Sequence, residues 1–267
     1  MPLMKVNGAE LYVEDTGGGA ETIVFSHGLL WSGRMYDAQV AHLKARYRCV
    51  TYDHRGQGQS PPSPTPYDME TLAADAVALI GALGVAPVHF VGLSMGGFVG
   101  LRLASRQPEL LRSLVLVDTA ADTEPRANIP KYRAMSWVTR VFGYRPVLGS
   151  VMKIMFGPAF LEDAARAAQR RTMEQHLLAL PDQATRAALE AVIRRRHVED
   201  ELAKIRTPTL VVHGAEDRAI VTPRARKMFD AIAGARWVTI PRAGHTSTVE
   251  EPDAVTRAIE EFVGQHG

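Results

Sequence analysis

The chain has 267 residues, of which 46% are hydrophobic and 22% are charged, a composition typical of a folded globular protein and not of a disordered or fibrous chain. Its net charge of +2 gives no reason to expect a nucleic-acid partner. A single cysteine, Cys49, excludes an internal disulfide and a zinc site built from cysteines. No apolar run is long enough to span a bilayer, and the opening residues lack the apolar stretch of a signal peptide, so we expect a cytoplasmic protein without membrane partners.

Short apolar runs alternate with longer amphipathic runs along most of the chain. We expect an opening hairpin at residues 5–6 and 10–15, and further strands at residues 22–26, 48–53, 88–92, 113–118, 209–214 and 236–240. These later runs are rich in Val, Ile and Leu, which is typical of strands buried on both faces of a parallel sheet. Between them, apolar residues of 68–83 recur at three- and four-residue steps and predict a helix that Gly84 ends. The alternation predicts an α/β fold with a doubly wound, mostly parallel sheet.

One segment combines a strand, a tight turn and a helix. The pentapeptide Gly92-Leu-Ser94-Met-Gly96 follows the strand expected at 88–92 and precedes a helix expected at 98–106. Glycines at both ends permit a sharp bend in which flanking side chains would clash, and the bend pushes the Ser94 hydroxyl out over the edge of the sheet. The following helix points its positive end at the same place and favours a developing oxyanion. The segment therefore predicts a serine nucleophile, with a glycine-rich structural turn as the alternative.

Residues 119–206 break the alternation of strands and helices. They contain no clear strand, their helical stretches are separated by prolines, and they carry a net charge of +5. Because the sheet resumes at Thr209, we expect a helical lid inserted into one α/β core of residues 1–118 and 207–267. The run Arg194–Arg196 is interpreted as a solvated helix face or as the outer surface of this lid.

A serine hydroxyl needs a base, and the base needs a partner that orients it. Asp217 and His245 each follow one of the last two expected strands. Like Ser94, both stand at the carboxyl ends of strands, where a doubly wound sheet places its sites. We predict a triad of Ser94, His245 and Asp217. Asp118, which ends an earlier strand, is the main alternative for the acid, and Glu216 is a weaker one.

Four separated motifs together resemble the α/β-hydrolase superfamily along nearly the whole chain. In order, they are Ser26-His27-Gly28-Leu29, the run from Asp53 to Ser60, the serine turn, and the Asp217/His245 pair. The resemblance implies an oxyanion hole formed by the backbone N–H groups of Leu29 and Met95. It also implies structural roles for His27, Asp53 and Arg55.

Serine at the turn argues against the haloalkane dehalogenases and epoxide hydrolases of this superfamily, which carry Asp there. The Leu-Ser-Met-Gly-Gly turn and the Gly-His-Thr-Ser-Thr-Val-Glu-Glu-Pro ending are most similar to enol-lactonase-like enzymes, including 3-oxoadipate enol-lactonases and lactonases of N-acyl-homoserine lactones. The resemblance therefore implies ester hydrolysis by lactone ring opening, without deciding between these two substrates. A general carboxylesterase or arylesterase with perhydrolase side activity is an alternative, although Leu29-Leu30 replaces the Trp-Pro frequent in perhydrolase relatives. A C–C bond hydrolase is another, although Leu93 replaces the Asn usual there.

The substrate pocket is expected beneath the lid. Trp31 follows the oxyanion turn, and Trp137, Met155 and Phe156 lie in the lid, where they line a pocket or form the lid's core. We expect a small-molecule ester or lactone as the partner and leave the oligomeric state open.

Neither a metal nor a cofactor is expected. The nine histidines include no His-x-His pair and no His-Glu-x-x-His motif. Gly56-x-Gly58 lacks the third glycine of a dinucleotide site, because Pro61 stands in its place. A small-molecule receptor on the same fold is the non-enzymatic alternative, but the intact set of three triad residues favours hydrolysis.

Overall fold

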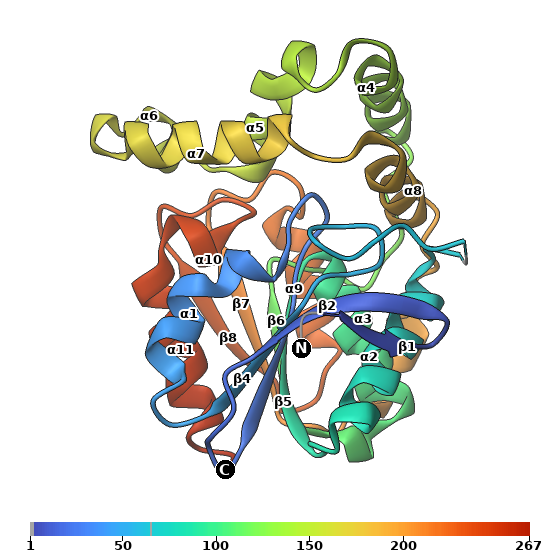
Figure 1. Ribbon diagram of the computed structural model, residues 1–267. Helices are drawn as coiled ribbons and strands as arrows, with labels where there is room; N and C mark the ends of the chain where they lie inside the picture. Colours follow the sequence, from blue (N-terminus) through green and yellow to red (C-terminus); the bar gives the residue numbers. More distant parts are fainter. Residues whose placement is uncertain (1–2, 65) are drawn as a thin grey trace.

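An eight-stranded sheet runs through the computed structural model, which describes residues 3–64 and 66–267 (Figure 1). Its strands are β1 (Leu3–Val6), β2 (Ala9–Asp15), β3 (Thr22–Ser26), β4 (Arg48–Tyr52), β5 (Val88–Leu93), β6 (Leu111–Val117), β7 (Thr209–Gly214) and β8 (Arg236–Ile240). Their spatial order is β1-β2-β4-β3-β5-β6-β7-β8. The pairs β1–β2 and β2–β4 are antiparallel, and the remaining described pairs are parallel. The expected mostly parallel sheet is confirmed.

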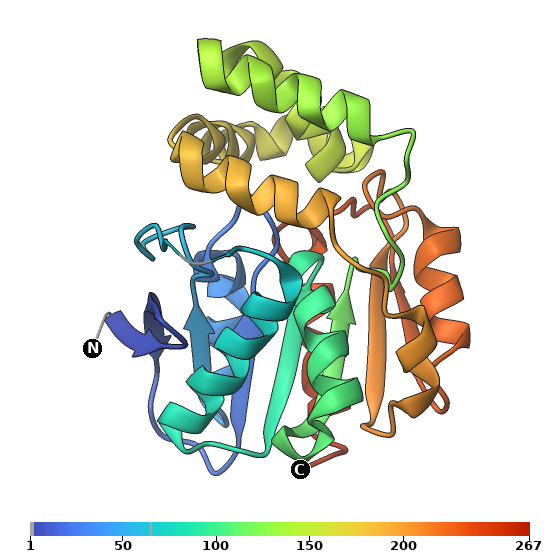
Figure 2. The same ribbon diagram turned by 90° about the vertical axis from the view of Figure 1, so that its right-hand side faces the viewer.

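Helices cover both faces of the parallel strands, which explains why these strands are apolar (Figures 1 and 2). One face is covered by α1 (Asp37–Leu43) and α11 (Pro252–Val263), and the other by α2 (Met69–Leu83), α3 (Met95–Arg106) and α9 (Thr222–Asp230). Along β3, Ile23 and Phe25 pack in the hydrophobic core on the side of α1 and α11, and Val24 packs in the core on the side of α2 and α3. All three are fully buried, and the two polar residues at the ends of the strand, Thr22 and Ser26, are buried as well.

Helix α2 shows how the local sequence sets the ends of an element. The Asp68 carboxylate accepts the backbone N–H of Thr71 at 3.0 Å and caps the first turn. Gly84 adopts φ 63°, a left-handed conformation that ends the helix. The helix expected at 68–83 is therefore confirmed to within one residue.

The turn after β4 packs against the rest of the fold through buried ionic and polar contacts. The Asp53 carboxylate accepts the N–H groups of Gly33 at 2.6 Å and Gln59 at 2.7 Å. Arg55 donates from Nε to the buried carboxylate of Asp75 at 2.7 Å. These contacts agree with a structural role for this turn.

Residues 119–206 form helices that lie beyond the carboxyl ends of the parallel strands, as Figures 1 and 2 show. They include α4 (Ile129–Phe142), α5 (Leu148–Met155), α6 (Pro158–Glu162), α7 (Ala167–Leu178) and α8 (Asp182–Ile193). We call this segment the helical insertion, and α4 is its outermost helix in Figure 2. Among the described residues, no helix combines the length and the apolar character that crossing a bilayer requires.

The arginine run after α8 is not uniformly exposed. The Arg194 side chain is 73% exposed, whereas that of Arg195 is 1% exposed and pairs with Glu124 at 3.0 Å. The Arg195 guanidinium also lies 4.3 Å from the centroid of the Phe98 ring. The interpretation of the run as a solvated outer surface is therefore wrong for Arg195, because partners from distant segments bury it.

Candidate active site

Ser94 occupies a strained turn between β5 and α3. Its φ of 50° and ψ of −109° lie where residues other than glycine are rarely found. A Cβ at Gly92 would lie 2.3 Å from the Gly96 carbonyl oxygen, and a Cβ at Gly96 would lie 1.9 Å from that of Ser26. Close backbone packing therefore requires both glycines. The helix begins at Met95, three residues earlier than expected, so Ser94 stands directly at its positive end.

The structure brings the three predicted triad residues together. His245, between β8 and α10 (Ser247–Glu250), has Nε2 2.9 Å from Ser94 Oγ and Nδ1 2.8 Å from Asp217 Oδ2. The other Asp217 oxygen accepts the N–H groups of Ala219 at 2.8 Å and Ile220 at 2.9 Å. All three residues are buried. This arrangement can take a proton from a serine hydroxyl while a carboxylate fixes the imidazole tautomer.

The two alternative acids make other contacts. The Asp118 carboxylate accepts the backbone N–H groups of Gly214 at 2.7 Å and Ser247 at 3.2 Å. Glu216 accepts the N–H of Ala159 in α6 at 2.9 Å. Both carboxylates therefore hold backbone in place, and the imidazole is bonded to neither of them.

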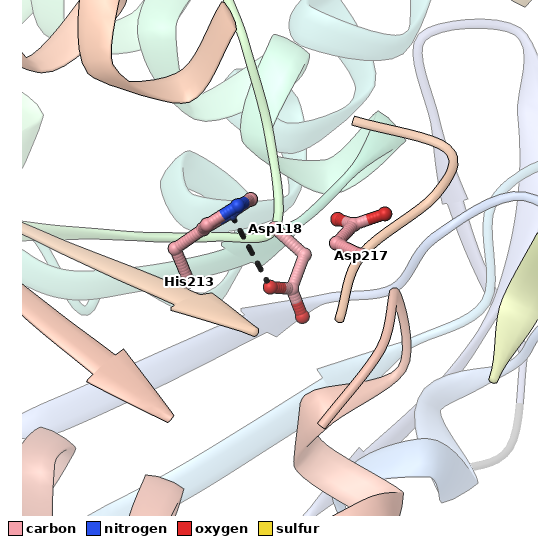
Figure 3. A group of neighbouring side chains, drawn as sticks. All are labelled: Asp118, His213 and Asp217. Atoms are coloured by element: carbon pink, nitrogen blue, oxygen red, sulfur yellow. Dashed lines mark ion pairs between the residues drawn. The ribbon is translucent and has the colours of Figure 1, made fainter. Parts of the chain in front are cut away.

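Asp118, His213 and Asp217 form a buried group near the carboxyl ends of β6 and β7 (Figure 3). Their potential ligand atoms all lie within 4.8 Å of one another. Asp118 Oδ1 and His213 Nδ1 face each other at 3.8 Å. Each of the four carboxylate oxygens already faces an N–H donor. Because each oxygen already accepts a hydrogen bond, the group suits a hydrogen-bonded network better than a metal ion.

Burial and charge set the proton affinities of the site. Burial lowers the pKa of His245, but the Asp217 carboxylate and its hydrogen bond outweigh this effect, so the pKa lies above its ordinary value of 6.5. Burial, followed by the nearby Asp217 carboxylate, raises the pKa of Asp118 to about 8. The imidazole is therefore a stronger base than a free one, whereas Asp118 tends to keep its proton at neutral pH.

The loop after β3 lies against the serine. A Cβ at Gly28 would lie 3.5 Å from Ser94 Cβ, so the loop that carries Leu29 packs against the serine side chain. Met95 is the first residue of α3, so its N–H has no carbonyl partner one turn earlier in the helix. Two N–H groups in these positions can hold an oxyanion. His27 supports the loop by accepting the N–H of His54 at 2.9 Å.

Ser94 and His245 open into a cavity between the sheet edge and the helical insertion. The space measures about 980 Å³, open solvent at its mouth included. Its walls are mostly apolar and include Leu29, Leu30, Phe98, Met135, Val147, Val151, Ile154, Met155, Leu189, Val192 and Ile220. Polar side chains enter the wall at Glu124, Tyr132, Thr185, Arg186 and Arg195. Such a cavity is typical of a site for a small, largely apolar molecule.

Met155 lines this cavity as expected, but the prediction of Trp31, Trp137 and Phe156 as pocket residues is wrong. Trp31 stacks on His176 of α7 with 5.0 Å between ring centroids, and Phe156 packs edge-on against Trp31. Trp137 is 59% exposed. Trp31 and Phe156 therefore pack the loop after β3 against the helical insertion, and Trp137 faces solvent.

Sequence reasoning missed several side chains of the cavity wall. Tyr132, Ser136 and Thr139 of α4 line it beside Met135, and their three- and four-residue spacing could have indicated one shared helix face. Glu124 and Arg195 carry no such signal, because their pairing depends on tertiary packing.

Residues 21–252 match the sequence profile of a family described as the alpha/beta hydrolase fold. A protein of Pseudomonas syringae pv. syringae, provisionally named carbamate hydrolase RutD, is 31% identical over 260 residues, which cover 91% of this chain and 94% of that protein. The 3-oxoadipate enol-lactonase 2 of Acinetobacter baylyi is 28% identical over 238 residues, covering 89% and 86%. The solved enol-lactonase of Burkholderia xenovorans LB400 is similar with a TM-score of 0.90 at 30% identity, covering 98% of this chain and 100% of that one.

Proposed function

The chain belongs to the alpha/beta hydrolase fold family and is a hydrolase, and on this premise we propose that it hydrolyses carboxylic esters, most of all lactones, through an acyl-enzyme. The observation that carries the proposal is the placement of His245 Nε2 2.9 Å from Ser94 Oγ at the wall of a largely apolar cavity. The substrate is then a small molecule with an apolar acyl part.

Acylation begins when Ser94 Oγ attacks the lactone carbonyl carbon while His245 Nε2 takes the hydroxyl proton. The carbonyl oxygen becomes an oxyanion between the N–H groups of Leu29 and Met95, each worth about 3 kcal/mol in the transition state. The ring C–O bond then breaks, and the imidazolium gives its proton to the leaving alkoxide. That alcohol stays attached to the acyl group.

Deacylation repeats these steps with water. His245 takes a proton from a water molecule, and the resulting hydroxide adds to the acyl carbon. When the second oxyanion collapses, Ser94 Oγ leaves and recovers the proton from the imidazolium. In both halves the Asp217 carboxylate stabilises the imidazolium, and the N–H groups of Ala219 and Ile220 hold that carboxylate in position.

The cavity supports a lactone as substrate. Because the opened alcohol remains tethered, the site must hold both a compact ring and its longer product, and a large apolar cavity provides this room. We propose that residues 119–206 act as a lid that limits water around the ester. The relative named as a carbamate hydrolase makes a small carbamate a second candidate. The apolar walls favour an acyl substrate over so small and polar a molecule.

A substrate panel tests the proposal. The measurement is kcat/KM for N-acyl-homoserine lactones of several chain lengths, an enol-lactone, p-nitrophenyl acetate and a small carbamate, each on wild type and Ser94→Ala. We expect lactones to be the better substrates and the variant to be inactive. Turnover of the aryl ester alone would indicate a plain carboxylesterase, and turnover of the carbamate alone would favour the second candidate. Binding of lactones without turnover of any compound would indicate a receptor.

A further inference from the structure

Glu250, the last residue of α10, is 1% exposed and lies next to the loop that carries His245. Its Oε1 accepts the backbone N–H groups of Gly244 at 2.9 Å and Thr246 at 3.1 Å. Its Oε2 accepts the N–H of Gly157, between α5 and α6, at 2.8 Å. Since Gly244 and Thr246 are the chain neighbours of His245, one carboxylate holds the peptide groups on both sides of the base and joins them to the helical insertion.

We propose that Glu250 is a positioning residue that fixes the His245 loop against the helical insertion and so keeps Nε2 on the Ser94 hydroxyl. It makes no hydrogen bond to the hydroxyl or to the imidazole, so it acts through the backbone. This inference rests on the proposed function, because His245 needs such positioning only if it is the base.

Two further contacts join the same segments. Thr246 Oγ1 donates to the carbonyl oxygen of Met155 at 2.8 Å. A Cβ at Gly244 would lie 2.2 Å from the nitrogen of Gly157, so the two backbones approach each other too closely for a side chain. Because the Met155 side chain lines the cavity, the cavity wall and the His245 loop are held together by side-chain and backbone contacts.

The electrostatic surroundings agree with this role. Three N–H donors suit an ionised carboxylate, which only accepts hydrogen bonds. Burial opposes ionisation and raises the pKa of Glu250 to about 7. The charged groups around it are the Asp217 carboxylate, the Glu216 carboxylate beside Gly157, and Arg166, which donates to the Glu250 carbonyl. In return, the Glu250 charge helps raise the pKa of His245.

The test measures the rate at which a fluorophosphonate labels Ser94, a reaction that needs the nucleophile and base but no particular substrate. In Glu250→Gln, the amide NH₂ must face at least one N–H donor, and the loop shifts. We expect labelling, and kcat for p-nitrophenyl acetate, to fall about 100-fold, as for a displacement of about 1 Å, with KM nearly unchanged. Glu250→Asp keeps the charge but is one methylene shorter, so we expect a smaller fall. The matched control is Glu251→Gln. In the wild type the Glu251 carboxylate pairs with Arg166 at 2.7 Å, and the variant should be labelled at the wild-type rate.

The pH profile separates positioning from mere stabilisation of the fold. Labelling requires neutral His245, so its rate falls as the pH falls through the pKa of that imidazole. Because burial raises the pKa of Glu250 to about 7, part of its negative charge is present through this limb, and Glu250→Gln removes that part, so the acid limb should move modestly to lower pH. In Glu250→Asp the limb should stay near its wild-type position. A residue that only stabilised the fold would lower the rate without moving the limb.

The outcomes distinguish this inference from the proposed function. If wild type is not labelled at Ser94, the proposed function is wrong and the role of Glu250 falls with it. If wild type is labelled and Glu250→Gln matches it in rate and in acid limb, only the role of Glu250 is overturned. If near-ultraviolet circular dichroism shows that Glu250→Gln does not fold, Glu250→Asp decides, and a wild-type labelling rate in it overturns the inference.

Discussion

Replacing Asp217 with Asn should lower kcat about 10⁴-fold while the fold stays intact. The N–H groups of Ala219 at 2.8 Å and Ile220 at 2.9 Å both point at Asp217 Oδ1. In the variant, the amide oxygen therefore takes this position and the NH₂ group faces His245. The NH₂ then donates to Nδ1, so the ring proton moves to Nε2, which can no longer accept the proton of Ser94. The same substitution in serine proteases costs about 10⁴ in kcat through this wrong tautomer.

The same substitution at Asp118 should lower kcat less than about tenfold. An asparagine there keeps one of the two contacts, with Gly214 at 2.7 Å or Ser247 at 3.2 Å, and leaves the other N–H without an acceptor. The lost contact should lower the free energy of unfolding by about 1–3 kcal/mol but does not touch the imidazole tautomer. Because burial and Asp217 raise the pKa of Asp118 to about 8, the neutral amide also changes little charge at neutral pH.

The assay is release of nitrophenolate from p-nitrophenyl acetate, with kcat and KM determined for wild type and both variants at one pH. Thermal unfolding followed by circular dichroism checks that each variant is folded. We expect the Asp118 variant to retain at least about 10³ times more activity than the Asp217 variant. A reversed ranking would assign the acid to Asp118, and equal losses would refute the argument from the Asp217 donor geometry.

The site geometry sets three other outcomes. Ser94→Ala and His245→Ala should each lower kcat by several orders of magnitude, and the double variant should be little worse, whereas additive losses would contradict a joint role. The acid limb of kcat/KM, measured between pH 5 and 9, should have its midpoint above 6.5, because Asp217 more than offsets the effect of burial on the pKa of His245. Met155→Ala should change the ratio of kcat/KM between long- and short-chain acyl lactones. Trp137→Ala should leave this ratio unchanged, because that side chain lies outside the cavity and its residue is 59% exposed.

The sheet and the grouping of the site were predictable because burial imposes a pattern on the sequence. Strands covered on both faces are mostly apolar, and β3, β5 and β7 bury every residue. Motifs that follow such strands meet at one edge of the sheet whatever the helices between them do. For this reason Ser94 and His245 could be placed together although 151 residues separate them.

The cavity wall was not predictable in the same way. Helix α4 carries apolar residues on opposite sides, so that Met135 lines the cavity while Trp137 is exposed to solvent. Hydrophobicity alone does not distinguish these two positions. Arg195 stood in a run of three arginines, and its burial depends on Glu124, 71 residues earlier, and on Phe98. Pairs that form through tertiary packing leave no local pattern in the sequence.

The contacts between the cavity wall and the base suggest how acyl groups affect the chemistry. Met155 presents its side chain to the cavity and its carbonyl to Thr246, next to His245. A substrate chain that packs on Met155 would therefore contact the segment through which, in our proposal, Gly157 and Glu250 position His245. Binding energy from a non-reacting part of the substrate can then hold the base in its reactive place. Since p-nitrophenyl acetate has almost no acyl chain, longer acyl lactones should show a higher kcat as well as a lower KM than this ester.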